Sequence, residues 1–242
     1  MNLIIDIGNT STKVAVFDNG KIIEESANEL NIVAEKIQTL RQVHSIKKCI
    51  ISSVVDNTGA FFSACQKHFK TILLSHGTTI PISNNYATPQ TLGNDRISCA
   101  VGSSIKYKNQ NTLSIDMGTC IKYDFIDNQN NYQGGAISPG VQMRFKSLNT
   151  FTSQLPLVRS TSLDNYIGKN TESSIASGVM NGILNEINGV ISQYKSEYTQ
   201  LNVIITGGDY KYFEKGLKNI TFADPYLVLK GLNEILEYNT KN

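Results

Sequence analysis

The sequence has few of the residues that metal, thiol or histidine catalysis requires. Its 242 residues include four cysteines and three histidines. The cysteines form no Cys-x-x-Cys pair and no His pair accompanies them, which argues against a zinc site and against a disulfide framework. We therefore interpret them as reduced thiols of a cytoplasmic protein. The histidines lie in no motif, so neither Ser-His-Asp nor Cys-His catalysis has support in the sequence.

Long apolar runs and an excess of one charge sign are also missing. No stretch approaches the roughly 18 apolar residues of a membrane helix, and no basic segment precedes an apolar one at the start. We therefore expect a soluble protein with no membrane partner. The formal net charge is only +2, and the longest basic run is Lys47-Lys48. This balance argues against nucleic acid as the main partner.

The sequence does contain one short pattern that occurs twice. Residues 3–10 read LIIDIGNT and residues 113–120 read LSIDMGTC, so that Asp6 and Asp116 are separated by about half of the chain. Each copy is typical of a strand that carries a carboxylate near its end and is followed by a tight turn. Either copy alone could be only a turn, since turns favour Asp and Gly. Two such turns facing each other would suit a nucleotide polyphosphate with a bound cation.

Strands and helices are expected in a similar order in both halves. In the first half we predict strands at 2–7, 12–17, 21–25, 49–55 and 71–74, a hairpin turn at 18–20, helices at 30–42, 56–67 and 94–107, and an irregular loop at 77–91. In the second half we predict strands at 112–116, 121–126, 132–137, 203–205 and 219–222, and helices at 140–150, 172–197 and from 226. This order predicts an α/β protein with two domains, residues 1–110 and 111–242, and a cleft between them.

The first candidate site is the segment 6–13, which follows the first strand. Gly8 lets the backbone approach a phosphate, and polar side chains follow at Asn9, Thr10, Ser11 and Thr12. Lys13 offers a fixed positive charge to a phosphate oxygen, and Asp6 offers a carboxylate to Mg²⁺ through water. Alternatively, Lys13 is a strand lysine that faces solvent.

The second candidate site is the segment Gly93, Asn94, Asp95 and Arg96, at the start of a predicted helix. A carboxylate at this place can accept the proton of an alcohol, and the adjacent Arg96 can hold an anionic substrate by two bonds. Alternatively, Asn94 or Asp95 is only a helix N-cap.

Four further segments of the second half offer glycines or donors. Thr119 can donate to a phosphate, and residues 134–140 read as a glycine-rich turn before a helix, a place where anions bind. Alternatively, the glycines of 134–140 are only structural. Residues 168–171 are interpreted as a helix cap that leaves a side chain for a ligand. The glycines of 206–209 can pass close to a nucleoside.

In this combination, the chain resembles the actin-like ATPase fold of sugar kinases, acetate kinase and Hsp70 chaperones, built from two duplicated ribonuclease H-like domains. Within that group it resembles a type III pantothenate kinase over essentially its whole length. The two Asp-x-Gly turns indicate only the superfamily, whereas residues 93–96 (GNDR) and 134–140 (GGAISPG) are more specific. The remaining matching segments are 152–156 (TSQLP), 168–171 and 206–208.

The resemblance implies ATP-dependent phosphorylation of the pantothenate hydroxyl, the first step of coenzyme A synthesis, with Asp95 as general base. It also implies a homodimer with sites near the subunit interface, and a monovalent cation, K⁺ or NH₄⁺, at Asp116 beside Mg²⁺. The residues implied to contact ATP are those of 6–13 and Thr119. The residues implied to contact pantothenate are Tyr86, Gly93, Asn94, Asp95, Arg96 and Thr171.

The chain departs from the family after Asp116. Where the family usually has Ala and, two residues later, Thr, this sequence has Cys120 and Lys122. If Lys122 points toward Asp116, its ammonium can replace the monovalent ion. Two other functions stay open on the sequence alone. One is another actin-like kinase that acts on a sugar or small acid, and the other is a regulator that binds nucleotide without catalysis.

Overall fold

The computed structural model describes residues 1–29, 32–55, 59–159 and 166–241, which group into two compact units. The first unit consists of Met1–Lys108, Asn130–Gln133 and Tyr226–Asn242. The second consists of Asn109–Gln129 and Gly134–Pro225. The first unit therefore includes two segments that we assigned by sequence to the second domain, 130–133 and 226–242. As a division into domains, 1–110 and 111–242 stays a prediction.

The first unit is built on a five-stranded sheet in the order β3-β2-β1-β4-β5. Its strands are β1 (Asn2–Ile7), β2 (Thr12–Asp18), β3 (Lys21–Asn28), β4 (Lys48–Ser53) and β5 (Lys70–Leu73). The first three strands are antiparallel, whereas β4 and β5 run parallel to β1. Asn19 and Gly20 have φ angles of +47° and +77°, which confirms the hairpin turn predicted there.

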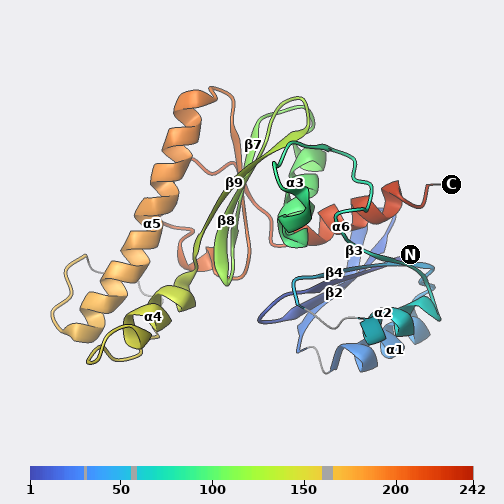
Figure 1. The fold of residues 1–242 in the computed structure, drawn as a ribbon, viewed down its shortest axis with the longest axis horizontal. Helices are drawn as coiled ribbons and strands as arrows, with labels where there is room; N and C mark the ends of the chain where they lie inside the picture. The colour runs from blue at the N-terminus through green and yellow to red at the C-terminus, as the bar shows by residue number, and fades with distance from the viewer. Residues whose placement is uncertain (30–31, 56–58, 160–165, 242) are drawn as a thin grey trace. The chain divides into compact units, whose positions relative to one another are not determined.

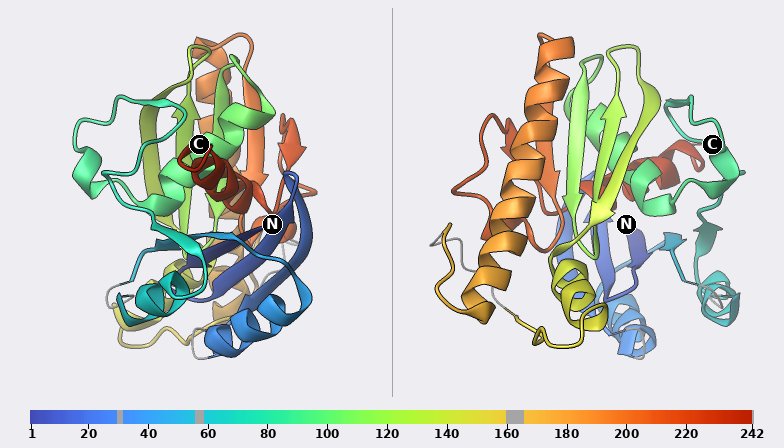
Figure 2. Two further views of the ribbon diagram at one scale, coloured as in Figure 1. Left: turned by 90° about the vertical axis from the view of Figure 1, so that its right-hand side faces the viewer. Right: turned by 60° about the vertical axis from the view of Figure 1, so that its left-hand side comes forward.

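Helices cover this sheet, as Figures 1 and 2 show. Helices α1 (Val33–Val43) and α2 (Gly59–Gln66) lie along one face, where Val33, Ile37 and Leu40 join a core with apolar residues of β1, β2 and β4. Helix α6 (Leu227–Tyr238) packs against β1 and β4, and also against α3 (Asn94–Lys106). The unit thus takes in the end of the chain because α6 buries its apolar face there.

Two glycines allow α3 and α6 to pack closely. A Cβ atom on Gly102 would lie 2.4 Å from the Leu227 carbonyl oxygen, and one on Gly231 would lie 1.8 Å from the Ser98 carbonyl oxygen. Any larger residue would force the helices apart. Since Asp95 lies in the first turn of α3, this packing also fixes the element that carries it.

The second unit contains most of a sheet whose strand order is β11-β10-β7-β8-β9-β6. Its strands are β7 (Thr112–Met117), β8 (Cys120–Ile126), β9 (Asn131–Pro139), β10 (Asn202–Thr206) and β11 (Phe222–Ala223). Strands β7, β10 and β11 are parallel, and β8 is antiparallel to β7. The short β6 (Ser83–Asn84) pairs with Asn131 and Tyr132 at the start of β9, and these four residues belong to the first unit.

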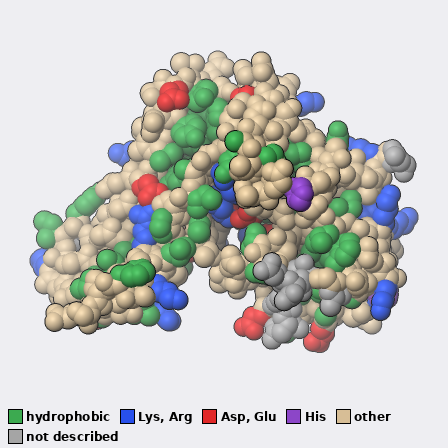
Figure 3. Space-filling model, in the orientation of Figure 1, with side chains coloured by type: hydrophobic (Ala, Val, Ile, Leu, Met, Phe, Trp, Pro, Cys, Tyr) green, Lys and Arg blue, Asp and Glu red, His purple; other side chains and the backbone are tan. Residues whose placement is uncertain are grey.

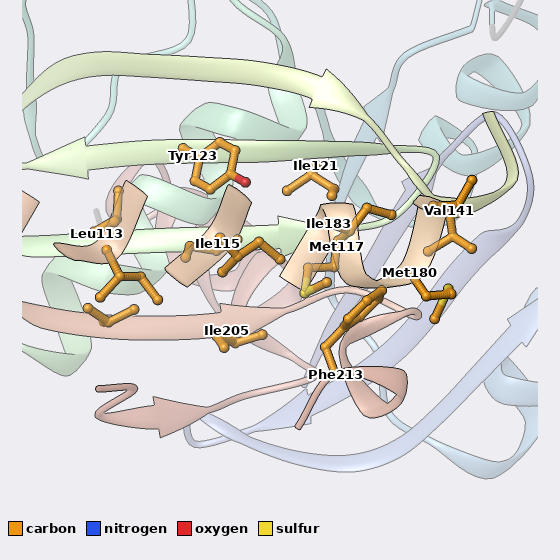
Figure 4. Packing of buried hydrophobic residues seen from close by; sticks show 14 of the residues in the cluster. Leu113, Ile115, Met117, Ile121, Tyr123, Val141, Met180, Ile183, Ile205 and Phe213 are labelled. Carbon is orange, nitrogen blue, oxygen red and sulfur yellow. The ribbon is translucent and has the colours of Figure 1, made fainter. Parts of the chain in front are cut away.

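Helices α4 (Val141–Thr150) and α5 (Thr171–Glu197) accompany this sheet. Apolar residues at helical spacing along α5, such as Val179, Ile183 and Ile187, are buried in a core with Ile115 and Ile205 of the strands. Figure 4 shows Ile183 beside these two strand residues. The long helix predicted at 172–197 is thereby confirmed as Thr171–Glu197.

Most predicted elements are present with shifts of a few residues. The start of the first helix at 30–31 and the helix start at Asp56-Asn57 lie outside the described residues. The predicted strand at 219–222 is the two-residue strand β11 at 222–223. The predicted loop at 77–91 contains β6 and a short 3₁₀-helix, Pro89–Thr91.

Within the described ranges, none of the helices has both the length and the apolar character needed to cross a bilayer. On the face shown in Figure 3, the Lys and Arg side chains of the described residues are dispersed and do not form one basic patch.

Candidate active site

Asp6 lies near the carboxyl end of β1, the central strand of the five-stranded sheet, and therefore at the sheet edge that the strand ends form. The Ser52 hydroxyl of the neighbouring β4 donates to Asp6 Oδ1 over 3.0 Å, and Lys13 is the Cα partner of Asp6 on β2. The Gly8 N–H donates to the Ser11 carbonyl oxygen over 3.1 Å, which closes a tight turn after the strand. The structure therefore gives Asp6 the strand-end position that its sequence pattern predicts.

The side chains of the turn differ in exposure. Asn9, Thr10 and Ser11 are exposed, whereas Thr12 is only 1% exposed. The three exposed polar residues are accessible to a ligand, while the Thr12 side chain is enclosed within the unit.

The start of α3 lies at the same edge of the sheet as Asp6. The Asn94 side-chain amide donates to the carbonyl oxygens of Ser53, at the end of β4, and Leu74, just after β5, over 3.3 and 3.0 Å. Because Ser52 and Asp6 are partners in the β4–β1 register, α3 begins beside the strand end that carries Asp6. Ligands of open α/β sheets bind at the carboxyl ends of the strands, so this edge is the candidate site of the first unit.

Asp95 is half-buried in the first turn of α3, and its Oδ1 accepts the Arg96 backbone N–H over 2.9 Å. The N-cap residue of this helix is Gly93, without a side-chain hydrogen bond to the first turn. The interpretation of Asn94 as the N-cap is therefore wrong, because its amide binds strand carbonyls instead. A carboxylate in the first helical turn is also stabilised by the helix dipole.

Arg96 and Tyr86, both predicted to contact pantothenate, lie together. Arg96 is 4% exposed, and its guanidinium carbon is 5.5 Å from the centroid of the Tyr86 ring, a cation–π distance. The Tyr86 N–H donates to the Asn84 side chain over 3.0 Å, and the Tyr86 ring is 6.1 Å from that of Tyr132. These contacts fix Tyr86 next to the start of α3.

Asp116 occupies the corresponding strand end in the second unit. Lys122, its Cα partner on β8, forms an ion pair with it, with Nζ 2.7 Å from Asp116 Oδ2. The Gly118 N–H donates to the Cys120 carbonyl oxygen over 3.1 Å, and Thr119 at the tip of the turn is exposed. This turn is the candidate site of the second unit.

Two glycine motifs converge on the turn after β7. The Gly140 N–H donates to the Thr119 carbonyl oxygen over 3.1 Å, and a Cβ on Gly140 would lie 2.2 Å from the Gly118 carbonyl oxygen. Gly207 has a φ of +95°, and a Cβ there would lie 2.3 Å from the Met117 carbonyl oxygen. The Asp209 N–H donates to that same oxygen over 3.0 Å. Segments 134–140 and 206–209 therefore both support this turn.

The glycine-rich segment 134–140 is not the turn that we predicted. Residues up to Pro139 belong to β9, and only Gly140, the N-cap of α4, lies outside it. Gly134 has a φ of +100°, and a Cβ on Gly135 would lie 1.7 Å from the Tyr123 carbonyl oxygen. The two glycines therefore allow β9 to approach the backbone of β8, a contact that the sequence pattern does not reveal.

The cap predicted within 168–171 is confirmed. Asn170 is the N-cap of α5, and its side chain accepts the Ser173 N–H over 2.8 Å in a capping box. Thr171, the first residue of α5, is exposed and belongs to the second unit, whereas the other residues predicted to bind pantothenate belong to the first.

Comparison with known proteins identifies the family. A profile described as type III pantothenate kinase matches residues 2–193. The chain is 43% identical over 242 residues to the type III pantothenate kinase of Phocaeicola vulgatus, with 100% of both chains covered. It is 39% identical over 243 residues to that of Flavobacterium johnsoniae, again with 100% of both covered. The chain belongs to the type III pantothenate kinase family. It is therefore a phosphotransferase, and its family implies ATP-dependent phosphorylation of pantothenate in coenzyme A synthesis.

Solved structures support the fold class. A Campylobacter jejuni protein described as a conserved Baf family transcriptional activator superposes with a TM-score of 0.64 at 22% identity, with 99% of this chain and 100% of that chain covered. A glucokinase from an Antarctic psychrotroph gives 0.53 at 12% identity, with 98% of each chain covered. At these identities the likeness shows the fold alone. The predicted actin-like α/β fold with two sheets is confirmed.

The kinase also contains a polar network that sequence reasoning missed. Arg144 of α4 donates to the Pro139 carbonyl oxygen and the Ser138 hydroxyl, each over 2.8 Å, and forms an ion pair with Glu186 of α5. The Tyr123 hydroxyl of β8 donates to Glu186 over 2.8 Å. The network ties α5 and β8 to the strand end that leads into Gly140. Nothing in the sequence indicates it, because Glu186 is remote along the chain from both Tyr123 and Arg144.

A surface pocket of about 360 Å³ lies elsewhere on the first unit of the kinase. Asn2 and Lys48, at the amino ends of β1 and β4, line it together with Glu237 of α6. It is therefore at the opposite edge of the sheet from Asp6 and the start of α3, and it takes in none of the predicted site residues.

Proposed function

We propose that this kinase transfers the γ-phosphoryl group of ATP to the primary hydroxyl of pantothenate, with Asp95 as the general base. The observation that carries this proposal is the common location of Asp6 and Asp95 at one edge of one sheet, fixed by the bonds from Asn94 to the strand ends. One carboxylate is thus available for the metal-bound phosphates and another for the acceptor hydroxyl.

The reaction needs a proton acceptor and good positioning more than covalent chemistry. The hydroxyl oxygen of pantothenate forms a bond to the γ-phosphorus while the bond from that phosphorus to the β,γ-bridging oxygen breaks. The hydroxyl proton passes to Asp95, and ADP leaves. The first-turn N–H that binds Asp95 Oδ1 holds the carboxylate in one orientation, which a general base requires.

We propose that pantothenate binds through Tyr86 and residues 93–96, with Thr171 as a further contact. The guanidinium of Arg96 suits the pantothenate carboxylate, because its planar fork can donate two parallel bonds. Its position over the Tyr86 ring supports this role, since stacking limits its rotation without using its N–H donors.

We propose that ATP binds the turn after β1, Lys13 and Thr119. Support comes from the exposed polar residues of the first turn and from the exposure of Thr119. Gly8 keeps the first turn tight, since a Cβ at this position would lie 3.1 Å from the Ser11 carbonyl oxygen. Unlike Asn9, Thr10 and Ser11, Thr12 has a buried side chain, so we assign it the role of anchoring the turn to β2.

Asp6 fits the Mg²⁺ that accompanies ATP. Mg²⁺ prefers oxygen ligands and keeps several waters, so one strand-end carboxylate together with substrate phosphates is a usual set. Among the described residues, no group of three or more His, Cys, Asp or Glu side chains could hold a metal by itself. When bound, Mg²⁺ supplies positive charge that offsets the charge of the phosphates.

The monovalent cation implied by the family does not fit beside Asp116 in this chain. The ammonium of Lys122 is already in contact with the Asp116 carboxylate, and a second cation there would meet a like charge. Asp116 remains the residue to which the family resemblance assigns the ion.

We propose that the enzyme is a homodimer that associates through the second unit. Large apolar side chains are exposed on β9, on α4 and on the segments after α4 and before α5, which favours burial against another chain. They are Ile137, Met143, Phe151, Leu157 and Ile167. Light scattering on the purified protein should give twice the chain mass.

A direct assay tests the proposed activity. The purified protein, ATP and Mg²⁺ should convert pantothenate to a phosphorylated product with the release of one ADP. Glucose, N-acetylglucosamine and acetate, offered at the same concentration, should give rates at least about 10²-fold lower, because the two sugars lack the carboxylate that Arg96 is proposed to bind and acetate lacks the alcohol. Phosphorylation of a sugar in preference to pantothenate would favour the other actin-like kinases, and ATP binding without any turnover would favour a regulator.

A further inference from the structure

The ion pair between Lys122 and Asp116 lies at the place where the family resemblance puts a monovalent cation. The Lys122 side chain is 16% exposed and that of Asp116 is 13% exposed, and the two charged atoms are 2.7 Å apart. The pair joins directly opposite positions of the β7–β8 hairpin. Because both groups are largely withdrawn from water, salt screens this contact less than a surface ion pair.

A second carboxyl group, that of Asp209, lies close enough to Asp116 to feel its charge. Asp209, whose backbone N–H binds the Met117 carbonyl oxygen, follows the adjacent strand β10. Burial raises the pKa of Asp209, and the negative charge of Asp116 raises it further. Two carboxyl groups therefore share this strand-end region, and a cation in contact with Asp116 relieves their repulsion.

The two halves of the chain place a lysine at the same position. In the first hairpin Lys13 is the Cα partner of Asp6, and in the second Lys122 is the Cα partner of Asp116. A lysine side chain opposite the strand-end carboxylate is thus compatible with this hairpin geometry. Chemically, the ammonium of lysine is an ammonium ion with one hydrogen replaced by carbon.

From these observations we infer that Lys122 permanently supplies the positive charge beside Asp116, so that this kinase needs neither K⁺ nor NH₄⁺. The inference rests on the proposed function for the identity of the reaction. It also predicts that ATP binding and stability of the wild type do not change with the monovalent ion, and neither property depends on pantothenate. Replacement of Lys122 by a small polar residue should open the position to an ion and create the dependence.

The test compares the wild-type protein with Lys122→Thr in buffers that contain K⁺, NH₄⁺ or Na⁺ at equal ionic strength. For the wild type, kcat/KM, the dissociation constant for MgATP and Tm should agree within about twofold, or about 1 °C, in all three salts. For Lys122→Thr, kcat/KM in Na⁺ should fall at least about tenfold, and K⁺ or NH₄⁺ should restore most of it, together with ATP affinity. Lys215→Thr, which removes an exposed lysine of the same unit, is the matched control and should match the wild type in every salt.

Each result decides the inference. It is overturned if the wild type loses tenfold or more of its activity or ATP affinity without K⁺ and NH₄⁺. It is equally overturned if Lys122→Thr keeps wild-type activity in Na⁺, or if the folded variant is inactive in all three salts. If Lys122→Thr does not fold, the wild-type comparison and Lys122→Met, which keeps the length of the stem without its charge, decide instead. If pantothenate is not phosphorylated in any salt, the proposed function fails, while the ATP titrations and Tm values still test the role of Lys122.

Discussion

Replacement of Asp95 by Asn separates a catalytic role from a purely structural one. The carboxylate lies in the first turn of α3 and accepts the Arg96 N–H through Oδ1. Asn keeps an oxygen of the same shape for this bond but loses the negative charge. The loss of a favourable charge at a helix N-terminus costs about 0.3–1 kcal/mol, which lowers Tm by no more than about 4 °C in a chain of this size.

The catalytic effect should be several times larger. A positioned general base contributes about 10²–10⁴ to the rate, which corresponds to about 2.7–5.4 kcal/mol in the activation free energy. We therefore expect Asp95→Asn to lower kcat by this factor, with a small change in Tm and with ATP binding retained. Steady-state kinetics, thermal unfolding and calorimetric titration with MgATP measure the three quantities.

The matched control is Glu35→Gln, which removes the acidic charge from the first turn of α1. It should show a comparable small change in Tm and no change in kcat. If Asp95→Asn also keeps kcat within about threefold of the wild type, Asp95 is only a residue of the first helical turn. The chemistry would then need another base.

Three other substitutions test the assignments of Asp6, Arg96 and Glu186. Asp6→Asn should nearly abolish turnover while CD spectra stay unchanged, because the amide can still accept from Ser52 but lacks the charge for the metal-bound phosphates. A near-wild-type kcat would contradict the role of Asp6 in binding Mg²⁺. Arg96→Lys should weaken pantothenate binding by about 1.5–3 kcal/mol, since an ammonium cannot reproduce two parallel bonds. The KM for ATP should change much less, and equal changes in both KM values would indicate a structural role for Arg96. Burial raises the pKa of Glu186, but its hydrogen bonds with Arg144, Tyr123 and Ser138 and the charge of Arg144 hold it below the usual value. The stability that Glu186 contributes should therefore be present above the unfolded-state pKa of about 4.3 and be lost as the pH falls through the lower folded-state pKa. Glu186→Gln should lose less Tm than the wild type on acidification. Parallel curves of Tm against pH for the two proteins would refute this assignment.

The amino-acid sequence by itself determined the features that depend on local patterns. The two Asp-x-Gly strand ends, the Asn-Gly hairpin, the cap at Asn170 and the start of α3 at Asn94 follow from residues only a few positions apart. Turn conformation, capping and hydrophobic periodicity act over this range, so a single sequence contains the necessary information. The family resemblance rests on the same short segments, and it assigned most of the proposed roles.

Tertiary structure decided what distant segments do to one another. Gly140 and Gly207 must be glycine because they pack on the backbone of the turn after Asp116, and β9 takes the glycines that we assigned to a turn because they pass close to β8. Helix α6 joins the first unit, since its apolar face packs on α3 and on two strands of that unit. The partners of Lys122 and Arg144 likewise depend on strand register and helix packing. Such contacts depend on close packing between segments that are remote along the chain, and neither residue type nor local spacing specifies them.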